Sequence, residues 1–267
     1  MISSSAYLLV FHGSRSSKTH SAASDLCRLL TIKFRYRNIL TQQNYLRANL
    51  TCSELEIATI KNLPMTPLVE VAALELAPLS LNESLVNFAQ TAYQKGYRKI
   101  KVLPLFLAPG IHVTKDIPDE IALAAKRINN HLTIELLPYL GKYSGMIPLI
   151  SREFSQLSGE TQILMAHGSS LSTATKYFQN LSVKLNAVIA YWSISPSLRE
   201  QVTAQIAAGY QKIAILPYFL FPGKISRAIA LEVEALQAEN PQVELIMGQP
   251  LGACEALAQM IFEEVEV

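Results

Sequence analysis

The chain has 267 residues, of which 50% are hydrophobic and only 16% are charged. It is therefore long enough to bury a large core, and disorder is excluded as a starting hypothesis. Its 23 basic and 21 acidic side chains leave a formal charge of +2, and no long run of either sign favours nucleic acid as a partner.

The three cysteines, Cys27, Cys52 and Cys254, are far apart and form no pattern typical of zinc or iron–sulfur sites. This usage favours a reduced chain. The first apolar run, 7–11, is too short for a signal peptide, and the longest, around 102–111, is about half a membrane span. We therefore expect a cytoplasmic protein with no targeting segment and no membrane partner.

Short apolar runs alternate along the chain with longer amphipathic segments, which is the pattern of parallel strands joined by helices. In the first half, strands are predicted at 7–11, 68–76, 99–106 and 132–136. Helices are predicted at 81–95, at 116–129, where Asp116 and Pro118 favour a helix start, and at 143–157.

The second half repeats the first. Residues 9–14 (LVFHGS) recur at 164–169 (LMAHGS), and residues 96–110 recur at 209–223 with the same Pro-Gly ending. We expect a lobe at 1–158 and a second lobe at 159–267. Each is an α/β, Rossmann-like unit with a mostly parallel four-stranded sheet, and a cleft lies between them. The first lobe has extra residues at about 31–67, which are interpreted as an inserted helix pair or lid.

Each copy begins with a strand that leads directly into His-Gly-Ser. This places His12 at the carboxyl edge of a sheet, where ligands of α/β proteins bind, although a structural histidine is an equal alternative at this position. The chain contains neither GxGxxG nor GxxxxGK[ST], so a nucleotide is not expected.

His112 follows a second strand and its Pro-Gly turn, and Glu75 ends a third strand. On its own, His112 is most simply a surface loop residue. All three side chains are nevertheless expected at one sheet edge, where two imidazoles and a carboxylate form a site for a divalent transition metal.

The second copy retains His167 but not the other two residues. Alignment on Pro-Gly places Ile225 opposite His112, and alignment of 80–81 with 197–198 places Trp192 opposite Glu75. We therefore expect one site per chain, with the second lobe as the opposing wall of the cleft.

Taken together, these motifs resemble the class II chelatase superfamily, and within it the CbiX and SirB group of sirohydrochlorin chelatases. The resemblance rests on LVFHGSR at 9–15, LELA at 74–77 and PLFLAPGIHVTKDIP at 104–118. It implies two similar lobes around a macrocycle. It also implies metal-binding and proton-accepting roles for His12 and His112, and an acidic partner in Glu75. The family often has Asp-Pro after His-Gly-Ser-Arg, where this chain has Ser16-Ser17.

The implied function is insertion of Fe²⁺ or Co²⁺ into sirohydrochlorin, for sirohaem or cobalamin, without a cofactor beyond the substrate metal. Ni²⁺ stays open as a third metal, and the absence of a cysteine-rich tail favours iron. Imidazole is a suitable base near pH 7. Ser14, Arg15, Lys18 and Lys115 are candidates to bind the macrocycle's carboxylates, with a solvated surface charge as an equal alternative for Lys18 and Lys115.

Three other functions stay open on the sequence alone. A metal or tetrapyrrole carrier would use the same cleft without turnover, although it has no need of a base. A protohaem ferrochelatase shares the fold, but we find no apolar lip for docking on a membrane. An inactive paralogue fits the second half better than the first. Because one chain supplies both lobes, we expect a monomer.

Overall fold

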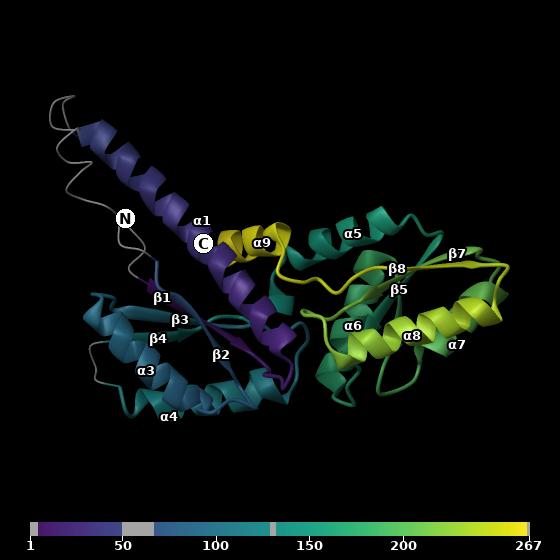
Figure 1. The fold of residues 1–267 in the computed structure, drawn as a ribbon, viewed down its shortest axis with the longest axis horizontal. Coiled ribbons are helices and arrows are strands. Elements are labelled where there is room, and N and C mark those ends of the chain that lie inside the picture. The colour runs from purple at the N-terminus through teal and green to yellow at the C-terminus, as the bar shows by residue number, and fades with distance from the viewer. Residues whose placement is uncertain (1–4, 50–66, 129–131, 266–267) are drawn as a thin grey trace.

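The computed structural model describes residues 5–49, 67–128 and 132–265, with the side chains of 41–49 left undescribed. Two lobes lie side by side along the longest axis of the molecule (Figure 1). Each lobe contains a four-stranded, fully parallel sheet with helices on its faces. The predicted α/β fold with two similar lobes is confirmed.

The sheet of the first lobe has the order β2-β1-β3-β4. Its strands are β1 (Ser5–Phe11), β2 (Val69–Ala73), β3 (Lys99–Pro104) and β4 (Thr133–Leu136). Every residue of β1 is buried, because a central strand of a parallel sheet is covered on both faces. The helices are α1 (Ser17–Asn49), α3 (Leu81–Gln94) and α4 (Ile117–Ala125).

The second lobe repeats this plan with the order β6-β5-β7-β8. Its strands are β5 (Thr161–Ala166), β6 (Val188–Tyr191), β7 (Lys212–Pro217) and β8 (Glu244–Met247). Its helices are α6 (Ser172–Leu185), α7 (Leu198–Ala207) and α8 (Lys224–Glu239). The predicted duplication is therefore a repeat of topology as well as of sequence.

Helices α5 (Met146–Leu157) and α9 (Glu255–Val265) connect the lobes crosswise. Helix α5 precedes the second sheet and packs against β7 and α6, whereas α9 returns from the end of the chain to α1 (Figure 1). Side chains from both sheets and from these helices belong to one hydrophobic cluster. Our proposed division at 158/159 separates the two sheets in sequence, but the helices do not follow it.

The extra residues of the first half lie partly in α1. Residues 31–49 continue this helix instead of starting a separate one, so α1 has 33 residues where α6 has 14. The rest of the expected insert, 50–66, lies outside the described residues. Within the described ranges, no helix has both the length and the apolar character needed to cross a membrane.

Candidate functional site

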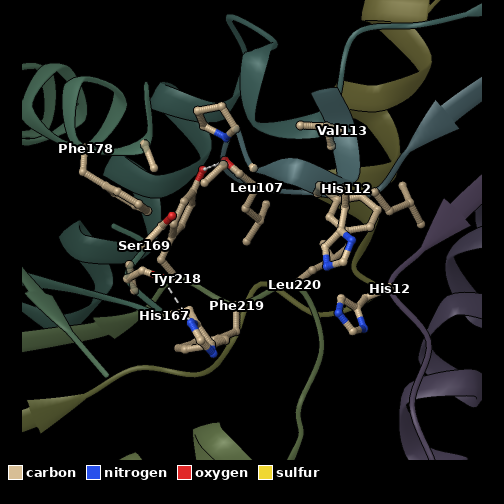
Figure 2. A pocket seen from close by; sticks show the side chains of 18 of the residues that line it. His12, Leu107, His112, Val113, His167, Ser169, Phe178, Tyr218, Phe219 and Leu220 are labelled. Carbon is tan, nitrogen blue, oxygen red and sulfur yellow. Dashed lines mark hydrogen bonds between the residues drawn. The ribbon is translucent and has the colours of Figure 1, made fainter. Parts of the chain in front are cut away.

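A cavity of about 530 Å³ lies between the two lobes, at the carboxyl ends of the central strands. This is the edge where parallel sheets bind ligands. Figure 2 shows His12 and His112 close together at one side of the cavity and His167 at the other. Most of the lining is apolar, and its larger apolar side chains are Leu105, Phe106, Leu107, Val113, Phe178, Phe219, Leu220 and Ile225.

The turn after β1 holds His12 against Glu75. The Glu75 N–H donates to the His12 carbonyl at 3.0 Å. Gly13 follows with a φ of +99°, and a Cβ at this position would lie 1.9 Å from the Glu75 carbonyl oxygen. Only glycine allows both this backbone conformation and this close approach. The His-Gly sequence thus brings the chain after β1 into direct contact with the chain after β2.

His112 opens a π-helical turn, η1 (His112–Asp116), directly before α4. Such turns are frequent at functional sites. The Nδ1 of His112 lies 2.8 Å from Oδ2 of Asp116. Because a carboxylate accepts hydrogen bonds, Nδ1 is the donor and Nε2 keeps its lone pair for a metal ion or a proton. The helix predicted from 116 therefore begins earlier, and its first turn orients a site residue.

The three predicted metal ligands come together. One ligand atom from each of His12, Glu75 and His112 can be chosen so that all lie within 4.8 Å of one another. The two imidazole rings are nearly perpendicular, with their centroids 4.8 Å apart, and Phe106 packs against both rings. Two nitrogen ligands and one oxygen ligand can hold a divalent transition metal and leave coordination positions open.

The other three predicted site residues are close to this cluster in sequence and lie outside the described lining of the cavity. Ser14 Oγ accepts a hydrogen bond from the Ser16 N–H at 3.0 Å, which shapes the turn before α1. Arg15 and Lys115 are exposed. They follow His12 and His112 by three residues each, so both cations stay near the metal ligands along the chain.

The second copy of the site differs from the first in a way that corrects the sequence alignment. Ser193 N–H donates to the His167 carbonyl, as Glu75 N–H does to His12, and Trp192 matches Leu74 in the same way. The residue opposite Glu75 is therefore Ser193, and the placement of Trp192 there was wrong. The error came from a one-residue difference between the two loops that lead to α3 and α7. Ile225 lines the cavity, as the Pro-Gly alignment predicted.

A pair of tyrosines, of which Tyr218 lines the cavity, joins the lobes. The hydroxyls of Tyr177 and Tyr218 lie 2.7 Å apart. Each hydroxyl also lies 3.1 Å from a first-lobe carbonyl, that of Gly141 for Tyr177 and that of Leu107 for Tyr218, so one phenol donates to the other and the second donates to its carbonyl. Burial raises the pKa of Tyr177 to about 12 and the pKa of Tyr218 well above its ordinary value, so both phenols stay protonated.

Sequence reasoning missed the role of Asp116, which it interpreted only as a helix-start residue. The spacing of four residues from His112 was a usable signal, because residues four apart share one face of a helix. It also missed the tyrosine pair, which no local pattern indicates, since the two residues lie on different elements and meet partners from the other lobe.

Comparison with known proteins gives a family match in each half. The sequence profile of the CbiX family matches residues 47–157 and, a second time, residues 161–266. The first match includes Glu75 and His112 but starts after His12. The sirohydrochlorin ferrochelatase of Priestia megaterium is 24% identical over 219 residues, which cover 77% of this chain and 79% of that protein.

Two solved structures of sirohydrochlorin chelatases have the same fold. SirB from Bacillus subtilis with Fe³⁺ has a TM-score of 0.70 at 20% identity, covering 98% of this chain and 94% of that one. SirB from Bacillus subtilis subspecies spizizenii in complex with cobalt has a TM-score of 0.66, with the same identity and coverage. At such low identity, these likenesses establish the architecture alone.

Proposed function

Because this chain belongs to the CbiX family, whose profile matches both of its halves, we propose that it is a sirohydrochlorin chelatase. It inserts Fe²⁺ or Co²⁺ into the macrocycle, which loses two pyrrole N–H protons in exchange. The observation that carries this function is the cluster of His12, Glu75 and His112 at the edge of a cavity between two lobes.

The first task is to hold the substrate metal until the macrocycle takes it. Ligands around a four-coordinate ion lie roughly 3.5 Å apart when each bond is about 2.0–2.2 Å. The donor atoms of the cluster spread over as much as 4.8 Å, so they need a small inward movement to bind the ion together. A partial and open ligand set suits a metal that must be passed on.

The second task is to hold the macrocycle with its nitrogens facing the metal. The apolar residues of the cavity, such as Phe106, Phe178 and Phe219, suit the faces of a tetrapyrrole ring. The carboxylates at the rim of the ring need polar partners beyond this apolar lining. We assign Ser14, Arg15 and Lys115 to these carboxylates, since they flank the histidine motifs.

The metal is a substrate in this proposal, and we infer no separate cofactor. Imidazole and carboxylate ligands accept Fe²⁺, Co²⁺ and Ni²⁺ alike. We also propose a monomer, because one chain supplies both walls of the cavity, and a cytoplasmic location, because Cys27 and Cys254 are unbridged. Light scattering of the purified chain tests the monomer.

The test of the function is the absorbance change of sirohydrochlorin mixed anaerobically with Co²⁺ or Fe²⁺. Wild type should accelerate insertion above the spontaneous rate, and His12→Ala, His112→Ala and Glu75→Gln should lose most of this acceleration. Glu70→Gln is a matched control, because Glu70 is an exposed glutamate of the same strand region, and it should keep wild-type rates.

A wild-type protein that binds the macrocycle but leaves the spontaneous rate unchanged would be a carrier, and the chelatase proposal would then be wrong. Equal losses in Glu70→Gln and Glu75→Gln would contradict the assignment of the cluster, because they would reflect a general effect of charge removal.

A further inference from the structure

His167 lies in the wall of the cavity that faces the metal cluster. It follows β5, the central strand of the second sheet, and its exposed imidazole is part of the cavity lining. Figure 2 places it across the open space from His12 and His112. The side chain therefore faces the cavity from the side opposite the metal cluster.

The local geometry of His167 copies that of His12. The Nδ1 of His167 lies 3.2 Å from the Gly168 carbonyl, and the Nδ1 of His12 lies 3.3 Å from the Gly13 carbonyl. A proton on Nδ1 is donated to that carbonyl in each case, which leaves Nε2 as the acceptor. The duplication thus preserved a base in the second lobe.

The metal partners of this base were not preserved. Ser193 and Ile225 occupy the positions of Glu75 and His112, and the clusters of possible metal ligands in the described residues include no group around His167. An imidazole without a second and third ligand is a poor metal site. His167 is therefore available for proton chemistry.

The reaction needs a base that is separate from the metal ligands. An imidazole nitrogen has one lone pair, which can bind either the metal ion or a proton. While His12 and His112 hold the metal, neither can accept a pyrrole proton through the same nitrogen. Tyr218 is excluded as a base because burial raises its pKa. Among the described lining residues of the second lobe, His167 is left as the proton acceptor.

On the basis of the proposed function, we propose that His167 is a further catalytic residue, which takes a pyrrole proton on the ring face opposite the metal cluster. The ring N–H bond breaks, its electron pair stays on the pyrrole nitrogen, and the proton binds Nε2 of His167. The freed nitrogen binds the metal ion that arrives from His12 and His112. The second N–H proton leaves to solvent after the ligands have released the metal.

The experiment compares His167→Ala and His167→Gln with wild type in three assays: Co²⁺ titration without macrocycle, fluorescence titration with sirohydrochlorin alone, and steady-state insertion. A lost general base should lower kcat by about 10²-fold, with both affinities kept within about twofold. Imidazole, added at constant free metal concentration, should restore part of kcat in His167→Ala and nothing in His12→Ala. Ser170→Ala, in the same loop and outside the lining, is the control.

Unchanged kcat in both His167 variants, with weaker sirohydrochlorin binding, would overturn the inference and make His167 a carboxylate contact. Lost Co²⁺ binding would overturn it as well, because His167 would then be a metal ligand. A failure of the chelatase function itself differs from both results, since wild type would then show no acceleration of insertion.

Discussion

The Asp116 carboxylate accepts the Nδ1–H of His112 across one turn, at 2.8 Å. This contact fixes which ring nitrogen of His112 faces the cavity, and the negative charge makes that nitrogen a better ligand. Asp116 is partly buried, so solvent does not fully replace the contact. At the scale of single residues, the site thus depends on a group that does not touch the metal.

Asp116→Asn should weaken Co²⁺ binding by about 10- to 100-fold, because the amide orients His112 less strongly and carries no charge. Titration of the purified variant with Co²⁺, without macrocycle, measures this effect. Asp119→Asn is the matched control, since Asp119 is an exposed acidic residue in the first turn of α4. Equal affinities in wild type and Asp116→Asn would contradict the positioning role.

Gly13→Ala should disrupt the metal cluster, because the new Cβ would collide with the Glu75 carbonyl and the φ of +99° strains any L side chain. We expect loss of Co²⁺ binding together with a lower Tm. Gly223→Ala is the comparison, because a Cβ there meets no atom within 4 Å and the backbone is extended. If Gly13→Ala kept wild-type affinity, the close approach would not be needed for the site.

The two copies of the repeat start corresponding helices with the same device. Ser80 and Glu83 form a capping box at the start of α3, and Ser197 and Glu200 form one at the start of α7. In each box the serine hydroxyl accepts from the glutamate N–H, and the glutamate accepts from the serine N–H. These helices follow the Glu75 loop and the Ser193 loop, so the caps define where both loops end.

The Glu200 box predicts a pH-dependent stability. Hydrogen bonds from the Ser197 N–H, and then from the Ser197 and Ser195 hydroxyls, lower the pKa of Glu200. The folded-state pKa is thus below the unfolded value of about 4.3, so the stabilisation is complete above that value and is lost as the pH falls through the folded-state pKa. Glu200→Gln should lower Tm at pH 7 and have a diminishing effect as the pH falls below about 4.

Thermal unfolding followed by circular dichroism between neutral and acid pH measures this difference. Glu234→Gln, at an exposed position in α8, is the control. Its Tm should differ little from that of wild type, and this difference should not diminish as the pH falls. A Tm gap between wild type and Glu200→Gln that grows on acidification would contradict this direction of the pH dependence.

At the scale of the whole molecule, the ends of the chain hold the lobes together. Helix α9 packs on α1 and α5, and the ring of Phe262 lies tilted against that of Phe34, with centroids 5.3 Å apart. Its Glu264 accepts from the Ser144 hydroxyl at 2.7 Å and the Gly145 N–H at 2.9 Å. Because α5 in turn packs on β7, α9 connects the first lobe to the second.

Ile261→Ala should destabilise both lobes together by about 2–5 kcal/mol, because Ile261 is fully buried in α9 and the change leaves a cavity. Trp192 is the single tryptophan and lies in the second lobe, far along the chain from the α1 contact. In Ile261→Ala, the urea midpoint of its fluorescence change should fall together with the midpoint of the circular dichroism signal. Ile261→Val should cost about 0.5–1.5 kcal/mol. If the urea midpoint of Trp192 fluorescence in Ile261→Ala stays at its wild-type value, the two lobes unfold independently and the prediction is wrong.

The sequence predicted the strands and the site edge well because these features are local. The apolar runs of β1 and β3 are buried on both faces, and the residues that follow such strands must meet at one edge. Prediction failed where a boundary depends on a turn: β2 ends at Ala73, and the chain then turns through Glu75, whose N–H bonds to the His12 carbonyl, and Leu76, which has a φ of +56°. It also failed for α1, because nothing in the polar run after residue 31 stops a helix.

The sequence by itself determined the duplication, the parallel α/β lobes and the candidate trio of His12, Glu75 and His112, since each depends on patterns within a short segment. Only the tertiary structure decided that Ser193 is the residue opposite Glu75, that α9 returns to α1, and that the tyrosine pair bridges the lobes. It also placed His167 across the cavity from the metal cluster. These features arise from contacts between distant segments, whose geometry is set by how two packed lobes fit together and not by any local pattern.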